Sequence, residues 1–207
     1  MIIIDHPQGS EEWRKARCGH FTASKATELL MKPTTAGYQN LISQIAYERM
    51  TGEPVESYKN EWMEYGNDHE DEASEAYELL TYNKAHKIGF IEENSWIGAS
   101  LDRTVGEKGG VEIQCVKWNT QIEYLLDPKV PTKYFNQIQF QLLVSRREWI
   151  DWFSWHPKLN PVKITVERDE TKSICAHLLR PYQGVRLWRR SVSRRDGYIT
   201  FRTIMPG

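Results

Sequence analysis

Apolar positions recur at helical spacing through the first part of the chain, up to residue 81. Each apolar stripe is bounded by a capping side chain, a glycine or a proline, which marks where a helix begins or ends. Ser10, for example, precedes two acids and so caps a short helix that stops near Gly19. The four predicted helices cover Ser10 to near Gly19, 22–31, Tyr38–Met50 and 61–81.

The fourth helix places an acid on its apolar stripe. Glu70, Ala73, Tyr77 and Leu80 fall at positions i, i+3, i+7 and i+10, so they share one face. An acid at the end of such a face is either capped or ion-paired, or it is a ligand aimed into a site. Helical spacing favours neither interpretation.

The pattern changes after residue 81, where β-branched and aromatic residues alternate with polar ones. Gly106 and the pair Gly109-Gly110 interrupt this stretch as hairpin turns. A helix is predicted for Thr132–Val144, and 170–190 is helical with an interruption near Pro181. The predicted strands are Ala85–Phe90, Trp96–Asp102, Val111–Val116, Trp149–Trp155 and Val162–Val166.

This order of elements predicts an α/β fold, with one small mixed central sheet flanked by helices. The length of 207 residues fits a single domain spanning 1–207. Within it we expect a helical N-terminal part over about 9–81, a sheet core over about 85–168 and a C-terminal helical segment over about 170–195.

Composition narrows the class of protein. With 40% hydrophobic and 27% charged residues the chain is globular, and no apolar run approaches the roughly 20 residues of a membrane span. The first residues lack a basic flank and a cleavage site, so a cytoplasmic protein is expected. Cys18, Cys115 and Cys175 form no C-x-x-C pair, which argues against disulfides and against cysteine-based zinc or iron–sulfur sites. We expect buried thiols.

Charge is uneven although the formal net charge is only −1. Acids crowd residues 61–76. The C-terminal quarter carries an arginine cluster, for which a solvated helix face is favoured over a phosphate-tracking or subunit-contact surface. The cluster consists of Arg180, Arg186, Arg189, Arg190, Arg194 and Arg195.

One stretch carries candidate chemistry. Ser100-Leu-Asp102 is followed, across a glycine-rich turn, by Glu112-Ile-Gln114. Because side chains in a strand alternate, Glu112 and Gln114 share a face, and the neighbouring strand brings Asp102 to them. Such a group of carboxylates suits Mg²⁺, which keeps several waters for phosphodiester hydrolysis. Taken alone, this pattern is more often structural than catalytic.

The predicted helix Thr132–Val144 adds amide side chains. Tyr134, Gln137 and Gln141 recur at i, i+3 and i+7, with Gln139 beside them. Glutamines on helices are usually solvent-exposed. Beside a metal site they could instead contact sugar and phosphate without adding charge.

Four blocks of residues, in order over about 8–170, resemble the lambda-exonuclease, YqaJ-like branch of phage recombination nucleases in the PD-(D/E)xK superfamily. Any one block is a modest signal, whereas four in order are specific. The blocks are Gln8-Gly-Ser-x-x-Trp13-x-x-x-Arg17-x-Gly19-x-x-Thr22-Ala-Ser24, Gly66-x-x-x-Glu70-x-x-Ala73, Ser100-x-Asp102 through Glu112-x-Gln114, and Tyr134-x-x-Gln137-x-Gln139.

The resemblance implies a 5′→3′ exonuclease that digests one strand of double-stranded DNA processively and leaves 3′ overhangs for recombination. It also implies a requirement for Mg²⁺, with Mn²⁺ as substitute. The expected assembly is a homotrimer that acts on DNA ends with a single-strand annealing protein, in the cytoplasm of a bacterial host and without a membrane.

The resemblance also assigns roles to residues. Asp102 and Glu112 become metal ligands with the Ile113 carbonyl, and Glu70 completes the site through a second ion or its waters. Positions that hold the 5′-phosphate correspond to Arg17, Ser24 and Ser100, whose donors suit a terminal phosphate. The plainer alternatives are a surface salt bridge for Arg17 and a helix cap for Ser24. DNA contacts are expected from Tyr134, Gln137 and Gln139.

The chain departs from the family pattern at three positions. Leu101 and Arg103 flank Asp102 where the family has proline and a small residue. Gln114 replaces the superfamily's lysine, a cation that orients the attacking water and offsets transition-state charge. Glutamine can orient water but carries no charge.

Two alternatives to an active exonuclease therefore stay open. One is a DNA-end-binding recombination protein whose nuclease site is attenuated at Gln114. The other is an endonuclease of the same superfamily, against which the phosphate-binding set Arg17, Ser24 and Ser100 argues.

Overall fold

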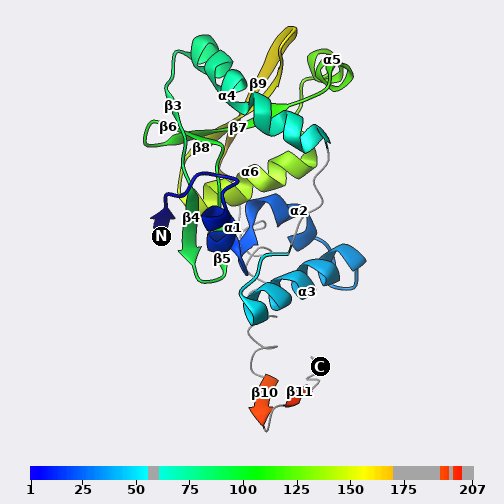
Figure 1. Ribbon diagram of the computed structural model, residues 1–207. Coiled ribbons are helices and arrows are strands. Elements are labelled where there is room, and N and C mark those ends of the chain that lie inside the picture. Colours follow the sequence, from blue (N-terminus) through cyan, green and yellow to red (C-terminus); the bar gives the residue numbers. More distant parts are fainter. Residues whose placement is uncertain (56–60, 170–191, 196–197, 202–207) are drawn as a thin grey trace.

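The computed structural model describes residues 1–55, 61–169, 192–195 and 198–201 (Figure 1). The helices are α1 (Glu11–Arg17), the 3-10 turn η1 (Ala23–Lys25), α2 (Ala26–Leu29), α3 (Ala36–Thr51), α4 (Glu61–Thr81), α5 (Trp118–Leu126) and α6 (Thr132–Ser145). The strands are β1 (Ile2–Ile4), β2 (Phe21–Thr22), β3 (Ala85–His86), β4 (Phe90–Asn94), β5 (Ile97–Ala99), β6 (Arg103–Val105), β7 (Gly109–Cys115), β8 (Trp149–His156), β9 (Leu159–Glu167), β10 (Val192–Arg195) and β11 (Tyr198–Phe201).

The larger sheet has five strands in the order β3-β6-β7-β8-β9. Strands β7 and β8 run parallel in continuous register from Gly109 opposite Trp149 to Cys115 opposite Trp155, and the other pairs are antiparallel. Parallel neighbours need a crossover, and here α5 and α6 supply it. The helix that leads into β8 therefore lies against the sheet that contains β7.

A second sheet has four strands in the order β1-β4-β5-β2. Its strand β5 continues through Ser100, Leu101 and Asp102 directly into β6 of the larger sheet. Leu101 is 1% exposed, and its carbonyl accepts a hydrogen bond of 2.6 Å from the side-chain amide of Gln8. A short, buried and anchored segment thus joins the two sheets.

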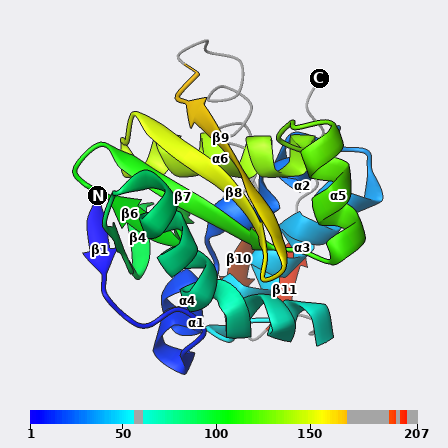
Figure 2. The ribbon, with the colours of Figure 1, turned by 90° about the horizontal axis from the view of Figure 1, so that it is seen from above.

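Helices cover both faces of the larger sheet, with α4 above and α6 below it in Figure 1. On one face, Ala73 and Tyr77 of α4 pack with Val111, Ile113 and Phe153. The opposite face packs Trp152 of β8 against apolar residues of α6. Figure 2 shows β7, β8 and β9 side by side, with α6 passing behind them. The mixed α/β architecture confirms the predicted fold class.

Local signals located most helices correctly. The hydroxyl of Ser10 accepts a hydrogen bond of 3.1 Å from the Trp13 amide, as a cap does, and α3 ends at Gly52 with φ 76°. The predicted helix 61–81 matches α4, although Leu80 is 52% exposed and leaves the predicted buried stripe.

Other expectations need correction. Strand β1 and helix α5 were not predicted, and the predicted strand Trp96–Asp102 ends at Ala99. Residues 192–195 form strand β10, paired with β11, whereas a helical segment was expected up to 195. The rest of that expected helix, 170–191, lies outside the described residues.

Two further expectations concern cysteines and membranes. Cys18 and Cys115 are free thiols that are partly buried, and Cys175 lies outside the described ranges. None of the helices that the structure describes is both long and apolar enough to span a bilayer.

Candidate active site

Two acids meet where the short inter-sheet segment enters the larger sheet. Asp102 directly precedes β6, and Glu112 lies on the neighbouring strand β7. The backbone N–H of Ile113 donates a hydrogen bond of 2.7 Å to Oδ2 of Asp102, which holds this carboxylate beside Glu112. The predicted alternation is confirmed, because Val111 and Ile113 pack under α4 on the opposite face of the strand.

Three glutamine amides hold the Glu112 carboxylate. Oε1 accepts from Gln114 at 3.1 Å and from Gln137 at 2.6 Å, and Oε2 accepts from Gln141 at 2.6 Å. Gln137 and Gln141 lie one turn apart on α6, so the packing of that helix aims both side chains at the acid. The amide of Gln141 also donates to the Ser100 carbonyl at 3.0 Å. Glu112 is therefore fixed by its own strand and by the crossover helix.

Burial and like charge raise the pKa of both acids. Burial raises the pKa of Asp102 well above its ordinary value, and the negative charges of Glu112 and Glu70 add to this. Burial likewise raises the pKa of Glu112 to about 7, with Glu70 adding to the rise and the glutamine hydrogen bonds opposing it. Glu112 is buried and Asp102 is partly buried, and a divalent cation bound between them would relieve the repulsion between their carboxylates.

The chemistry of these donors fits a hard divalent ion. Across the part of the chain that the structure describes, no three His, Cys, Asp or Glu side chains lie close enough together to form a metal site without other ligands. The available set is two carboxylates, Asp102 and Glu112, together with the nearby peptide of Ile113. Mg²⁺ is commonly held by one or two carboxylates and retains several waters, so this small donor set is sufficient.

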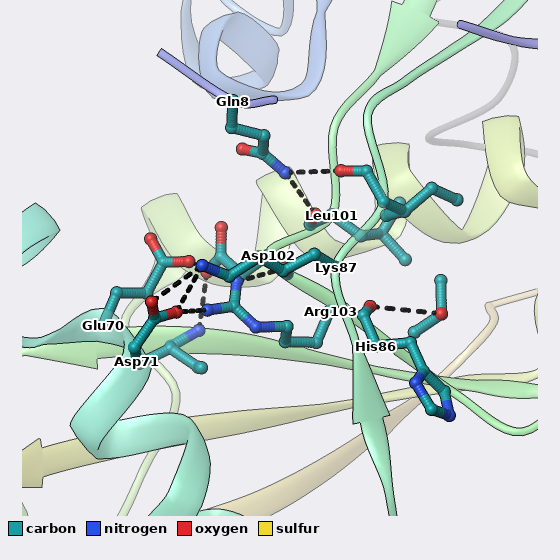
Figure 3. Close-up of polar contacts among 11 residues, drawn as sticks. Gln8, Glu70, Asp71, His86, Lys87, Leu101, Asp102 and Arg103 are labelled. Atoms are coloured by element: carbon teal, nitrogen blue, oxygen red, sulfur yellow. Dashed lines mark hydrogen bonds and ion pairs between the residues drawn. The ribbon is translucent and has the colours of Figure 1, made fainter. Parts of the chain in front are cut away.

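Glu70 approaches the two acids from α4 in an ion pair. Arg103 donates from Nη1 to Oε1 of Glu70 and, at 2.6 Å, to the Asp102 carbonyl (Figure 3). Its Nη2 donates to Asp71 at 2.6 Å, and Asp71 also pairs with Lys87 at 2.7 Å. Of the two interpretations that helical spacing left open for Glu70, the structure shows the ion pair.

A second polar group surrounds Arg17, the last residue of α1. Its guanidinium stacks 4.1 Å from the Trp13 ring and donates to the hydroxyls of Thr22 at 3.4 Å and Ser24 at 3.3 Å. The indole N–H of Trp13 donates to the Ser100 hydroxyl at 3.1 Å. The structure therefore brings Arg17, Ser24 and Ser100 together. Trp13 and Thr22 join them; both belong to the first block of the resemblance, which assigned them no role.

Arg17 has the features of an anion-binding group. Burial lowers its pKa to about 10, and the negative charge of Glu48 offsets this only in part. Within the described ranges no carboxylate forms an ion pair with Arg17, and Glu48 accepts hydrogen bonds from Gly19 and Gln44 instead. A partly buried guanidinium beside hydroxyls suits an oxyanion. Neither plainer alternative is observed among the residues that the structure describes, since Arg17 forms no salt bridge with them and the Ser24 hydroxyl caps neither η1 nor α2.

The remaining candidate residues all lie on α6, but their side chains contact different parts of the protein. Tyr134 is partly buried near Trp152, and burial together with the charge of Glu112 raises its pKa to about 12. Gln139 faces elsewhere, because its amide donates to the Glu167 carbonyl at 2.8 Å and accepts from the Asp169 N–H at 2.9 Å. The DNA contact expected from Gln139 is thus replaced by a structural role. Gln141, to which the resemblance assigned no role, reaches Glu112 together with Gln137.

Solved structures of exonucleases share the fold of this chain. The structure of LHK-Exo, an alkaline exonuclease from Laribacter hongkongensis, is 28% identical over 87% of this chain and 97% of that chain, with a TM-score of 0.75. Its complex with dAMP matches with 27% identity over the same shares and the same TM-score. A phage-related exonuclease from Haemophilus somnus is similar in fold alone, with a TM-score of 0.57 and 12% identity over 84% of this chain and 98% of that chain.

Family membership rests on the sequence itself. No curated protein sequence is detectably similar to the chain. The family model of the YqaJ-like viral recombinase domain matches residues 12–148, a span that includes Arg17, Asp102, Glu112 and Gln141. The chain belongs to the YqaJ-like viral recombinase domain family.

Proposed function

We propose that this protein is a divalent-metal-dependent nuclease of phage-type recombination that digests double-stranded DNA from the 5′ end and leaves 3′ overhangs. The single observation that carries the proposal is the pair of acids Asp102 and Glu112, held together by the hydrogen bond from the Ile113 N–H and joined by one short segment to the Arg17 group. Family membership and the likeness to an alkaline exonuclease support the nuclease activity. Mg²⁺ is the proposed ion, with Mn²⁺ as its substitute.

The roles of the acids follow from their positions. Asp102 and Glu112 hold the ion, with the Ile113 carbonyl beside them, and Glu70 contributes from α4. When bound, a divalent ion supplies Lewis-acid charge and an activated water for phosphodiester hydrolysis. The side-chain amide nitrogen of Gln114 donates to Glu112. The side-chain oxygen of Gln114 can therefore accept a hydrogen bond from a water. Gln114 orients that water but cannot take its proton.

The Arg17 group supplies the preference for a DNA end. A terminal 5′-phosphate carries more negative charge than an internal phosphodiester, and Arg17 offers it a charge-assisted fork with Ser24 and Ser100 alongside. Ser100 lies two residues before Asp102 in the chain. A phosphate bound at this group therefore brings the following phosphodiester toward the acids. DNA contacts from Tyr134 and Gln137 belong to the same proposal.

The assembly is also part of the proposal. The homotrimer and the single-strand annealing partner implied by the family resemblance are consistent with digestion that stays on one DNA molecule. Light scattering on the purified protein measures the number of chains, and a monomer at working concentration argues against the trimer.

An end-labelled digestion tests the function. Linear 5′-phosphorylated duplex carries a label at either the 5′ or the 3′ end and is incubated with the protein in Mg²⁺ or in EDTA. We expect early release of the 5′ label and late release of the 3′ label, in Mg²⁺ only. The reverse order of release contradicts the polarity, and equal digestion in EDTA contradicts the metal requirement.

The same assay separates the two alternatives. The uncharged Gln114 favours an attenuated, end-binding protein, which would shift linear duplex in a gel without releasing either label. Cutting of closed circular duplex would instead identify an endonuclease. The variant Asp102→Ala serves as the matched inactive control.

A further inference from the structure

Arg103 is a buried cation whose recorded partners are all oxygen atoms of acids or of the backbone. Its side chain is 4% exposed, and it donates to Glu70, to Asp71 and to the Asp102 carbonyl. Arginine side chains stay positively charged in proteins. A fixed positive charge therefore stands beside the candidate metal ligand Asp102, on the side from which Glu70 approaches (Figure 3).

Arg103 belongs to a series of ion pairs of alternating charge that runs from the surface to the candidate metal site. Exposed Lys87 pairs with Asp71, Asp71 pairs with Arg103, and Arg103 pairs with Glu70. Glu70 is near enough to the two acids for its charge to raise the pKa of Asp102 and of Glu112. It is thus the carboxylate that a second ion would need, and it is already neutralised from within the protein.

We propose that the Arg103 guanidinium occupies the position of a second divalent cation at Glu70, so that this chain binds a single divalent ion on Asp102 and Glu112. The inference rests on the proposed function and deepens it. A second ion at Glu70 would lie beside a buried guanidinium, where solvent and salt screen the repulsion poorly. Glu70 would then contact the single ion only through water molecules.

Counting bound Mn²⁺ tests this directly. Full-length protein without DNA is titrated with Mn²⁺ alone, and free Mn²⁺ is followed by its electron paramagnetic resonance signal at fixed pH and salt. We expect one Mn²⁺ per chain in the parent protein. Arg103→Met, which removes the charge but keeps much of the volume, is expected to gain a second Mn²⁺. The double variant Arg103→Met with Glu70→Gln is expected to return to one.

Lys87→Met is the matched control. It removes a cation from the outer end of the same charge chain, where Lys87 is exposed, and leaves the pair between Arg103 and Glu70 intact. We expect one Mn²⁺ per chain in this variant. A second Mn²⁺ gained by Lys87→Met would mean that total charge, rather than the position of Arg103, sets the count, and would overturn the inference.

The remaining outcomes are equally decisive. Two Mn²⁺ in the parent protein, or one in folded Arg103→Met, overturns the inference and leaves the proposed function standing. No Mn²⁺ in the parent protein removes the metal requirement of the proposed function, and the inference falls with it. If circular dichroism shows that Arg103→Met does not fold, Arg103→Gln takes its place, because its neutral amide can still donate a hydrogen bond to Glu70. A second Mn²⁺ in Arg103→Gln supports the inference, and one Mn²⁺ in folded Arg103→Gln overturns it.

Discussion

The side-chain amide nitrogen of Gln141 donates a hydrogen bond of 2.6 Å to Oε2 of Glu112. The same nitrogen donates to the Ser100 carbonyl, two residues before Asp102. One glutamine on the crossover helix therefore fixes one acid directly and the segment leading to the other acid through its backbone.

Replacing Gln141 is expected to impair the reaction more than binding. Gln141→Met keeps the volume but removes a hydrogen bond to a charged group, worth about 1.5–3 kcal/mol, so kcat should fall by about tenfold or more. Gln139→Met is the control on the same helix, because Gln139 bonds to the Glu167 carbonyl. Steady-state digestion rates measure both variants. Equal rates for Gln141→Met and the parent would contradict a positioning role.

Removing either candidate ligand should abolish digestion. Asp102→Ala or Glu112→Ala takes away a carboxylate that holds the ion, so Mg²⁺-dependent release of nucleotides should disappear while DNA binding persists. Nucleotide release and gel shift of linear duplex measure the two properties separately. A near-normal rate in either variant would remove the central assignment.

The Arg17 group should make the protein sensitive to the chemistry of the DNA end. We expect faster digestion of 5′-phosphorylated duplex than of 5′-hydroxyl duplex, and Arg17→Ala should narrow this difference by removing a charge-assisted contact. Arg14→Ala, an exposed arginine of the same helix, is the control and should keep the difference. Rates are compared at fixed ionic strength. If the parent digests both ends equally fast, the phosphate assignment is wrong.

Gln114 decides how strongly the site depends on its metal ion. Gln114→Lys places a cation near the scissile phosphate and should raise the rate by about tenfold if it recovers about 1.4 kcal/mol of transition-state stabilisation. Gln114→Ala should lower the rate, because the water-orienting amide and the bond to Glu112 are both lost. Rates on one 5′-phosphorylated duplex compare the three proteins. No gain with lysine and no loss with alanine would show that this side chain has no catalytic role.

The raised pKa values of Asp102 and Glu112 should appear in the stability of the metal-free protein. A carboxyl whose pKa is higher in the folded state holds a proton that the unfolded chain releases, so stability should fall as pH rises toward about 7. Asp102→Asn should reduce this fall and raise the Tm at alkaline pH. Thermal unfolding in EDTA, from about pH 5 to about pH 8, measures both effects. A parent Tm that rises over this range would contradict the raised values.

Local chemistry made part of the molecule predictable from sequence. Helix caps and glycines mark the ends of helices within a stretch of a few residues, so the predicted positions of α1, α3, α4 and α6 are nearly correct. The predicted alternation of side chains on β7 is correct for the same reason, because it depends on neighbouring residues only. Helix α5 was missed because it is short and buries the polar residue Gln121 rather than an apolar stripe.

The partners of the acids depend on how distant elements pack, which no local pattern states. Gln137 and Gln141 reach Glu112 because α6 crosses beneath β7, and Arg103 reaches Glu70 because α4 lies on the other face. That Gln139 points away from Gln137 and Gln141 was predictable, since residues two positions apart in a helix point in directions about 200° apart at 3.6 residues per turn. The spacing of the three glutamines along the sequence therefore already indicated that only Gln137 and Gln141 share a face of the helix.

The short segment between β5 and β6 fixes a distance in the proposed reaction. It separates the hydroxyl of Ser100, on the side that would bind the DNA end, from the carboxylate of Asp102, on the side where hydrolysis would occur. Leu101 between them is buried, and Gln8 anchors its carbonyl, so this spacing has little freedom to stretch. The placement of the phosphate-binding side relative to the cutting side then depends on one buried leucine and its anchor.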